Sequence, residues 1–281
     1  MNYVRPSTTA DLLSALQEDG AAILCGGTDI LIRMRRGLLS PRTLVDVSRL
    51  EDLRGIEAVD GEIHIGAAVN ENTILRSPLV AERLPLLADV LKRLAAVEIR
   101  SRGSLGGNLV NASPAADSAI PLLLYEARLH LVGATGERWV PVREFFVGPG
   151  KTVLAKGEFV RAIAVPDPPA GARAFFHKIG RRRALIISIA SLGVLMRLAG
   201  ESVDLVRIAA GSVAPTPLRL DEAERVLLGE RLDDGRIREA ARAAARSVSP
   251  IDDVRATAGY RRQVVADLLE RFLRQARNDE T

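Results

Sequence analysis

Two glycine-dense segments contain the residues best suited to chemistry in this sequence. They are Cys25-Gly26-Gly27-Thr28-Asp29 and Gly103-Ser104-Leu105-Gly106-Gly107-Asn108. Glycine permits a positive φ and lacks the Cβ that would keep a bulky anion away, so successive N–H groups can converge on phosphate oxygens. Two such turns that meet from different parts of the chain would suit the pyrophosphate of a dinucleotide. The alternative is that each Gly-Gly pair only makes a tight turn.

The spacing of these glycines differs from that of the common phosphate-binding loops. The sequence contains no GxxxxGK(S/T), which disfavours a P-loop kinase or ATPase. Gly103-x-x-Gly106-Gly107 is not GxGxxG, and it follows a predicted helix rather than a strand. A Rossmann dinucleotide site is therefore not expected.

Two charged residues could complete an anion-binding or cofactor-binding site. Asp117, in Ser113-Pro114-Ala115-Ala116-Asp117, could accept hydrogen bonds from a ribose or ribityl hydroxyl, or could instead cap a helix over residues 118–124. Lys178 opens the densest basic run, Lys178-Ile179-Gly180-Arg181-Arg182-Arg183. That run could lie near an anionic cofactor or an acidic partner chain, or it could form a solvated turn between strands.

Residue counts exclude several other chemistries. The single cysteine cannot form an internal disulfide or hold an iron–sulfur cluster, which needs about four thiolates. The three histidines lie far apart without metal-ligand spacing, and no Ser-His-Asp or Cys-His constellation occurs, so we predict neither a metal site nor a catalytic residue. The net charge of +4 and the 4% aromatic content give no reason to expect nucleic-acid binding.

The sequence gives no sign of export or of stable membrane insertion. Residues 1–20 carry three acidic residues and have no apolar core, so they do not resemble a signal peptide. The longest apolar stretch, residues 184–196, is too short for a bilayer and is interrupted by serines and a glycine. We therefore expect a soluble cytoplasmic protein.

The elements that would position these residues fall into two parts, as expected for 281 residues. In the first part, hydrophobic spacing predicts helices over 7–19 and 79–99, strands over 21–24, 44–47, 127–132 and 159–165, and a hairpin over 56–69. Residues 102–121 are small and polar, which predicts a long functional loop. The proline-rich stretch 166–171 is the predicted domain boundary.

The second part is predicted to be a sheet followed by a helical bundle, an α+β arrangement. Strands are expected over 174–179, 185–198 and 203–210, in a meander. The first of three helices would be capped by Thr216, and the second would run from about 234 to 248. The third would run from about 256 to 277, with Tyr260 on its inward face.

In these motifs the chain resembles the FAD-binding medium subunits of the molybdenum hydroxylases, the group that contains carbon monoxide dehydrogenase and xanthine dehydrogenase. The resemblance covers nearly the whole chain. It rests on Leu24-Cys25-Gly26-Gly27-Thr28-Asp29, Ser104-Leu105-Gly106-Gly107-Asn108, Ser113-Pro114-Ala115-Ala116-Asp117, and Phe176-His177-Lys178 followed by Gly180-Arg181-Arg182 and Ser188-Ile189-Ala190.

The resemblance implies a two-lobed, vanillyl-alcohol-oxidase (PCMH)-type FAD-binding domain over 1–167, with lobes of about 1–55 and 56–167. It further implies a CO dehydrogenase flavoprotein-like C-terminal domain over 171–277, an α+β fold with a three-stranded antiparallel sheet and a three-helix bundle.

The resemblance also implies which residues would bind FAD non-covalently. The pyrophosphate and adenosine would be wrapped by Ile23, Leu24, Cys25, Gly26, Gly27, Thr28, Asp29, Ile30, Ser104, Leu105, Gly106, Gly107 and Asn108. Asp117 would hold a sugar or ribityl hydroxyl, and Leu94, Val160 and Lys178 would line the flavin site. A positive Lys178 near FAD would favour the reduced, anionic flavin. Cys25 replaces the small residue usual before Gly-Gly, and Ser188 stands where some relatives carry an acid.

The implied function is electron transfer within a molybdenum-dependent dehydrogenase. The chain would accept electrons from the [2Fe-2S] clusters of a small partner subunit and pass them to NAD, oxygen or a quinone. Molybdopterin and the substrate chemistry would be on a large partner subunit, in a dimer of heterotrimers. The single cysteine agrees, because the clusters cannot be held by this chain. Two alternatives are a stand-alone FAD-dependent oxidase or reductase of the same fold, and a non-catalytic assembly or nucleotide-binding protein.

Overall fold

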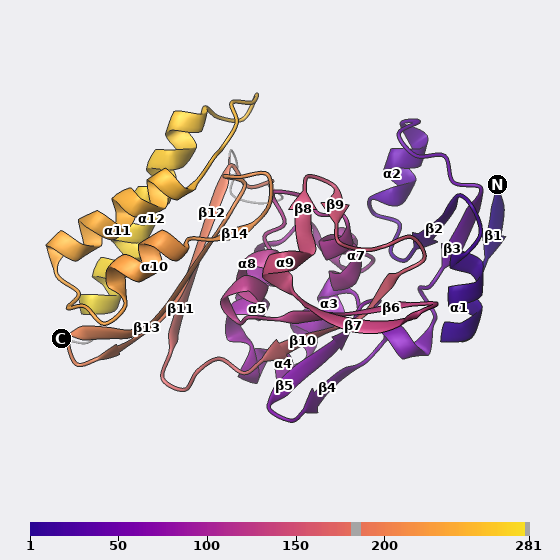
Figure 1. Cartoon of the computed structure of the whole chain (residues 1–281), viewed down its shortest axis with the longest axis horizontal. Helices are drawn as coiled ribbons and strands as arrows, with labels where there is room; N and C mark the ends of the chain where they lie inside the picture. The colour runs from indigo at the N-terminus through magenta and orange to yellow at the C-terminus, as the bar shows by residue number, and fades with distance from the viewer. Residues whose placement is uncertain (181–186, 279–281) are drawn as a thin grey trace. The chain divides into compact units, whose positions relative to one another are not determined.

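The structure, a computed structural model, describes residues 1–180 and 187–278. The chain divides into two compact units, which we describe separately (Figure 1). The first unit comprises Met1–Ala112 and Glu126–Asp167, and the second comprises Ser113–Tyr125 and Pro168–Thr281. The segment Ser113–Tyr125 thus groups with the C-terminal part of the chain, although the sequence places it in the middle of the first unit.

A small parallel sheet forms the N-terminal part of the first unit. Its strand order is β1 (Asn2–Val4), β3 (Thr43–Asp46), β2 (Ala21–Leu24). Helix α1 (Thr9–Leu16) begins at a capping box, in which the Thr8 hydroxyl accepts from the Asp11 N–H and the Asp11 carboxylate accepts from the Thr8 N–H. Leu12 of this helix packs in one core with Val45 of the central strand, and both are fully buried. The predicted helix and the two predicted strands are confirmed here.

A five-stranded antiparallel sheet forms the rest of the framework of the first unit. Its order is β4 (Ile56–Val59), β5 (Glu62–Gly66), β10 (Phe159–Pro166), β6 (Arg128–Gly133), β7 (Gly136–Pro141). The predicted hairpin joins β4 to β5 through Asp60 and Gly61, whose φ values of 47° and 81° fit a tight two-residue turn. Strand β7 was not expected, because most of its residues are exposed and lack apolar alternation.

Short helices and one further strand pair complete the first unit. They are α2 (Ile30–Arg35), the 3₁₀ turn η1 (Glu51–Leu53), α3 (Glu71–Arg76), α4 (Pro78–Arg83), α5 (Pro85–Arg93), α6 (Val97–Arg100), α7 (Leu105–Val110), α9 (Val142–Phe145), β8 (Phe146–Gly148) and β9 (Lys151–Thr152). The prediction of one continuous helix over 79–99 is wrong. Pro85 lacks an N–H and forces Leu84 out of helical geometry (φ −126°, ψ 54°), and Ala95 has a positive φ of 39°.

The prediction of a long loop over 102–121 is also wrong. Ser104 caps α7, because its hydroxyl accepts from the Gly107 N–H, and an apolar run forms α8 (Ala119–Leu124). The small residues concealed both helices, since glycine and serine have low helix propensity. What remains of the predicted loop is a short connection between α7 and α8.

The second unit has the expected sheet followed by the three expected helices. The sheet is antiparallel in the order β11 (Arg173–Ile179), β12 (Ala190–Ala199), β13 (Ser202–Gly211), β14 (Leu218–Arg219). The helices are α10 (Asp221–Leu227), α11 (Asp234–Ser247) and α12 (Ala258–Asn278). The predicted fold class is confirmed, and the two-residue β14 adds a fourth strand to the three expected.

The core of the second unit lies between this sheet and its helices. Buried Leu192 and Ile208 of the sheet share one cluster with Val265 and Leu269 of α12. Two local predictions were wrong: Thr216 does not cap α10, which begins after Leu220, and Tyr260 is half exposed rather than inward. Helix α8 packs on strands β12 and β13.

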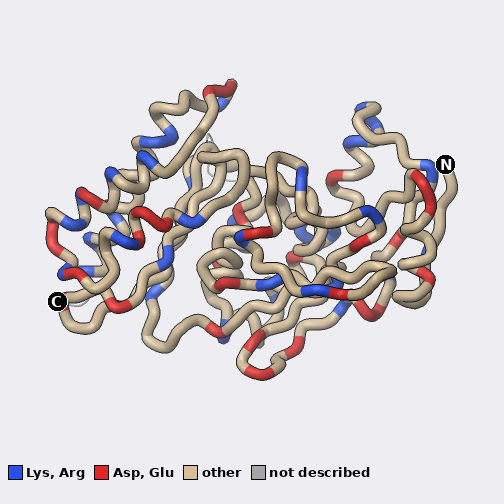
Figure 2. Tube along the Cα trace, viewed as in Figure 1, with Lys and Arg blue, Asp and Glu red and all other residues tan. Residues whose placement is uncertain are grey.

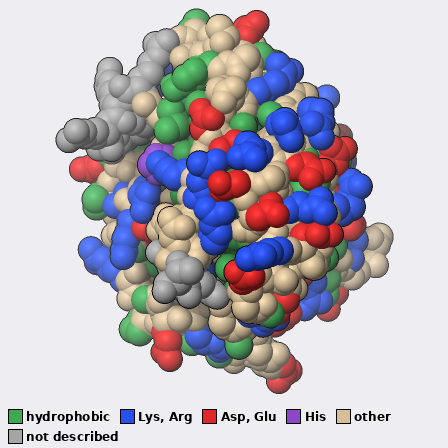
Figure 3. Space-filling model, turned by 90° about the vertical axis from the view of Figure 1, so that its left-hand side faces the viewer, with side chains coloured by type: hydrophobic (Ala, Val, Ile, Leu, Met, Phe, Trp, Pro, Cys, Tyr) green, Lys and Arg blue, Asp and Glu red, His purple; other side chains and the backbone are tan. Residues whose placement is uncertain are grey.

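The helices α10, α11 and α12 of the second unit carry acidic and basic residues together. Figure 2 shows basic and acidic residues interleaved along α10, α11 and α12, and Figure 3 looks onto this side of the molecule. Arg236 forms ion pairs with Glu230 and Glu239, at 3.0 and 3.1 Å, and Arg274 pairs with Glu270 at 3.1 Å. The arginines therefore neutralise nearby acids rather than form a purely basic patch.

Neither a membrane span nor a metal centre is found in the part of the chain that the structure describes. No helix of residues 1–180 and 187–278 combines the length and the apolar character needed to cross a bilayer. No group of three or more His, Cys, Asp or Glu side chains in the same ranges is placed to hold a metal ion.

Candidate cofactor site

A cavity of about 500 Å³ opens in the first unit and brings the two glycine segments together. Its walls come from the end of β2 and the turn into α2, from the connection after α5, from α7, and from the start of β10. All the residues that line it belong to the first unit.

The two glycine segments are in direct backbone contact. A Cβ added to Gly26 would lie 2.0 Å from the carbonyl oxygen of Arg102 and 2.9 Å from the nitrogen of Gly103. Only glycine allows so close an approach of two backbones. Next to it, Gly27 has a φ of +74°, which glycine adopts without strain. The sequence expectation that the two turns meet from distant parts of the chain is thus met.

At the second glycine pair, glycine is needed for close packing and not for a positive φ. Gly106 lies in α7 against Ala67, and an added Cβ would come within 2.6 Å of the Ala67 Cβ. Gly107 is also in α7 and has no positive φ, so the positive φ that glycine permits is not used there. A Cβ there would meet the Ser104 hydroxyl at 3.0 Å, and Gly107 is otherwise exposed at the cavity.

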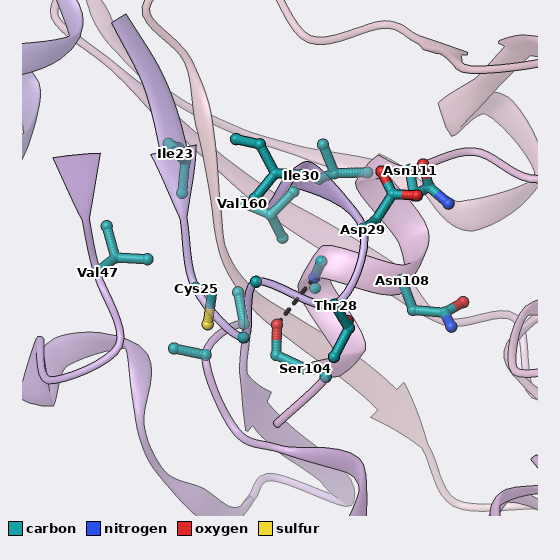
Figure 4. A pocket seen from close by; sticks show the side chains of 18 of the residues that line it. Ile23, Cys25, Thr28, Asp29, Ile30, Val47, Ser104, Asn108, Asn111 and Val160 are labelled. Carbon is teal, nitrogen blue, oxygen red and sulfur yellow. Dashed lines mark hydrogen bonds between the residues drawn. The ribbon is translucent and has the colours of Figure 1, made fainter. Parts of the chain in front are cut away.

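The cavity has a polar side and an apolar side (Figure 4). Thr28, Asp29 and Asn108 lie on one side of the view, whereas Ile23 and Val47 lie on the other. The Ser104 hydroxyl accepts a hydrogen bond from the Gly107 N–H at 3.1 Å, which fixes its position at the start of α7. This lining suits a ligand with a polar or anionic part and a larger apolar part.

Cys25 contributes a neutral thiol to this lining. Burial raises the pKa of the Cys25 thiol above its ordinary value, against a smaller lowering by a hydrogen bond with Ser104. A buried neutral thiol packs as a small hydrophobic group and is not a reactive nucleophile. Cys25 could have crowded the turn without abolishing it, and in the structure the turn is formed with Cys25 in the cavity lining.

A buried acid in the cavity, Glu71, was missed by the sequence analysis. It is the first residue of α3, its side chain is 2% exposed, and its Oε1 accepts from Asn108 Nδ2 at 3.2 Å. Burial raises the pKa of the Glu71 carboxyl to about 8, although the Asn108 hydrogen bond and the charge of Arg100 both lower it. From the sequence, Glu71 is an ordinary acid in the first turn of a helix.

Most of the predicted cofactor residues line this one cavity. These are Ile23, Cys25, Gly26, Gly27, Thr28, Asp29, Ile30, Leu94, Ser104, Gly106, Gly107, Asn108 and Val160. Leu24 and Leu105 do not line it. Leu105 is the first residue of α7 and is fully buried, and Leu24 follows Ile23 on strand β2, where successive side chains point to opposite faces. Lining residues that the sequence did not single out include Arg33, Val47, Glu71, Ala95, Asn111, Glu158 and Phe159.

Asp117 and Lys178, the remaining predicted residues, belong to the second unit and form a buried ion pair there. Lys178 Nζ donates to Asp117 Oδ2 at 2.9 Å, and the Ser188 hydroxyl donates to Asp117 Oδ1 at 2.6 Å. The Asp117 carboxylate is therefore held between Lys178 and Ser188, while Ser118 occupies the N-cap position of α8. Arg181, Arg182 and Arg183 of the predicted basic run lie outside the described residues.

Comparison with known proteins gives consistent matches over the whole chain. Residues 1–168 match the family described as the FAD binding domain in molybdopterin dehydrogenase, and residues 175–276 match the CO dehydrogenase flavoprotein C-terminal domain. The chain is 33% identical over 276 residues to the carbon monoxide dehydrogenase medium chain of Hydrogenophaga pseudoflava, which covers 98% of this chain and 96% of that one.

Two further comparisons agree. The chain is 31% identical over 278 residues to the xanthine dehydrogenase FAD-binding subunit of Escherichia coli O157:H7, covering 98% of this chain and 95% of that one. A solved structure of carbon monoxide dehydrogenase from Hydrogenophaga pseudoflava, which lacks the Mo-pyranopterin moiety of its cofactor, matches with a TM-score of 0.93 at 33% identity. That match covers 96% of this chain and 95% of the solved one.

Proposed function

Since the chain belongs to the FAD-binding medium subunits of the molybdenum hydroxylases, we propose that it holds FAD non-covalently and carries electrons through it. The electrons would come from the [2Fe-2S] clusters of a small partner subunit and would go to NAD, oxygen or a quinone. The chain is thus an oxidoreductase subunit whose own contribution is to bind and orient the flavin. FAD supplies the ability to take up and release electrons singly or in pairs.

The observation that carries this proposal is the contact between the two glycine segments at one cavity. Gly26 and Gly103 bring two backbone turns within contact distance, and both line the same space. A diphosphate placed there would meet main-chain groups without interference from a Cβ at Gly26, Gly27 or Gly107. Thr28 and Asn108 add short polar side chains on the same side.

The apolar side of the cavity would hold the ring systems of the cofactor. Ile23, Leu94 and Val160 line it, as the resemblance implies for the adenosine and the flavin. Their packing would exclude water from the ring faces, and burial of apolar surface would add to the affinity. We also propose that Leu24 and Leu105 support the cofactor site indirectly, as sequence neighbours of residues that would touch FAD.

For the second unit we propose the roles that the resemblance implies. Asp117 would accept a hydrogen bond from a sugar or ribityl hydroxyl, and Lys178 would place its positive charge near the flavin. Their mutual ion pair supports the idea that each fixes the position of the other. The proposed domain limits are 1–167, with lobes of about 1–55 and 56–167, and 171–277.

Two observations support the partners that we propose. Relatives of this chain are called medium chains, and one cysteine cannot ligate an iron–sulfur cluster. We therefore propose a small [2Fe-2S] subunit and a large molybdopterin subunit, assembled in the cytoplasm as a dimer of heterotrimers.

The proposal is tested by purifying the full chain together with the products of its neighbouring genes. We expect a yellow protein with stoichiometric FAD, which is released on denaturation, together with a molybdenum subunit and a cysteine-rich subunit. A colourless chain that fails to take up added FAD would exclude the proposed function. A flavin-containing chain that never associates with other subunits would instead favour a stand-alone flavoprotein.

A further inference from the structure

Glu71 places a carboxyl group in the cavity where the proposed function puts an anionic diphosphate. An added Cβ at Gly103 would lie 3.7 Å from Glu71 Oε2 and 3.5 Å from the Thr28 hydroxyl, so the acid stands at the junction of the two glycine segments. Its backbone N–H donates to the Gly103 carbonyl at 3.0 Å, and its Oε1 accepts from Asn108 Nδ2. Glu71 thereby links the start of α3 to the loop before α7 and to α7 itself.

The surroundings of Glu71 offer little compensation for a negative charge. No lysine or arginine of residues 1–180 and 187–278 lies within ion-pair distance of its carboxyl group. Arg100 of α6 acts on it from farther away, because its guanidinium donates to the carbonyls of Leu94 and Ala95 at 2.6 and 2.8 Å. A buried carboxylate without a close cation is strongly disfavoured, and two phosphate charges beside it would disfavour it further.

The other charged groups near α3 are engaged elsewhere or exposed. On α4 and α5, which pack against α3, Arg83 and Arg93 form ion pairs with aspartates, and the remaining charged residues are exposed. Within the cavity, Asp29 is exposed, Arg33 lies within reach of Asp29 at 3.8 Å, and Glu158 is paired with Arg138 at 2.8 Å. None of these charged residues forms an ion pair with Glu71.

We propose, resting on the proposed function, that Glu71 is a positioning residue that admits FAD only as a neutral acid. As a neutral acid, Glu71 holds Asn108 in place and adds no charge beside the diphosphate. As a carboxylate it would repel the diphosphate, so FAD affinity would depend on one proton at this side chain.

The titration of the cavity supports this assignment. Burial raises the pKa of the Glu71 carboxyl to about 8, so the acid is neutral at pH 7 and becomes charged above pH 8. Burial also raises the pKa of the Cys25 thiol, which opposes its ionisation over the same range. Hydrogen bonding to Arg138 lowers the pKa of Glu158, so that residue stays charged throughout. Because bound FAD favours the protonated acid, affinity should fall as pH rises through 8.

The test compares FAD binding by the full wild-type chain, Glu71→Gln and the matched control Glu158→Gln at pH 7 to 9.5. Glutamine keeps an oxygen that can accept from Asn108 but cannot ionise. The dissociation constant of the wild type should rise by about tenfold per pH unit above pH 8, or about thirtyfold between pH 7 and 9.5. Glu158→Gln should keep this slope, and Glu71→Gln should lose it while it binds FAD at pH 7.

A second readout does not depend on any variant. Calorimetry of FAD binding in two buffers of different ionisation enthalpy should show an uptake of about 0.8 proton per FAD by the wild type at pH 8.5. Equal pH slopes for wild type and Glu71→Gln, or no proton uptake by the wild type, would overturn the inference and leave the proposed function intact. A chain that binds no FAD at any pH would overturn both.

Discussion

Replacement of Gly26 by alanine should separate the two glycine segments and weaken FAD binding. The added Cβ would stand 2.0 Å from the Arg102 carbonyl oxygen and 2.5 Å from its carbonyl carbon, and both atoms belong to backbone. Ordinary carbon–oxygen contacts measure about 3.3 Å, so one turn must move by about 1.3 Å. Forced overpacking of this kind costs about 1–3 kcal/mol. Because backbone cannot rotate away like a side chain, we expect a cost of about 3 kcal/mol.

The free-energy cost of the Gly26→Ala clash should appear mainly as a loss of affinity for FAD. The unbound chain can relieve the clash by spreading the two turns, whereas the FAD-bound state needs them together. A cost of about 3 kcal/mol in the bound state corresponds to a loss of roughly hundredfold in affinity. The assay is quenching of flavin fluorescence during titration of the apoprotein, with the melting temperature measured alongside.

The matched control is Gly55→Ala, in the same unit. No atom lies within 4 Å of the Cβ that this change adds, and Gly55 has no positive φ. We expect wild-type affinity and a wild-type melting temperature for Gly55→Ala. If Gly26→Ala bound FAD as tightly as Gly55→Ala, the contact between the two turns would not be part of the cofactor site.

Three other changes test separate parts of the structure. Gly107→Val should lower the flavin-to-protein ratio, because its side chain would enter the exposed end of the cavity; an unchanged ratio would count against a ligand there. Lys178→Ala should keep FAD but lower its reduction potential in a potentiometric titration, and an unchanged potential would remove the proposed electrostatic role beside Asp117. Burial would raise the pKa of Asp46, but hydrogen bonds, first that from the Tyr3 hydroxyl and then those from Ser48 and Arg5, bring it down to about 2. Ionised Asp46 therefore stabilises the fold above about pH 4. In urea unfolding, the free energy of unfolding of the wild type should fall between pH 4 and 2 as this stabilisation is lost. Asp46→Asn should lack this fall.

The sequence was sufficient where local chemistry decides the structure. Asp60-Gly61 specifies a tight hairpin because both positions need a positive φ. Thr8 and Asp11 specify a helix start through reciprocal hydrogen bonds. The motifs at residues 24–29 and 104–108 predicted a shared site, and the structure brings these segments to one cavity.

The sequence was insufficient where tertiary contacts decide. The apolar spacing over 79–99 suits one helix, yet Pro85 and the positive φ of Ala95 divide it. Helix α7 is rich in glycine, and it exists because Ser104 caps it and Gly106 packs closely on Ala67. Glu71 could not be recognised either, since its burial depends on segments distant in sequence.

The early position of α8 in the chain has a consequence for biosynthesis. This apolar helix belongs to the second unit, and its Ile120 would contact any side chain added at Gly193 or Gly211. The ribosome makes Leu124 roughly 90 residues before Gly211, a delay of about 5–20 s at ordinary elongation rates. During that interval the helix has no sheet to cover it. The nascent polypeptide therefore exposes this apolar helix until β12 and β13 have been made, and a cut at residue 167 would separate α8 from the strands on which it packs.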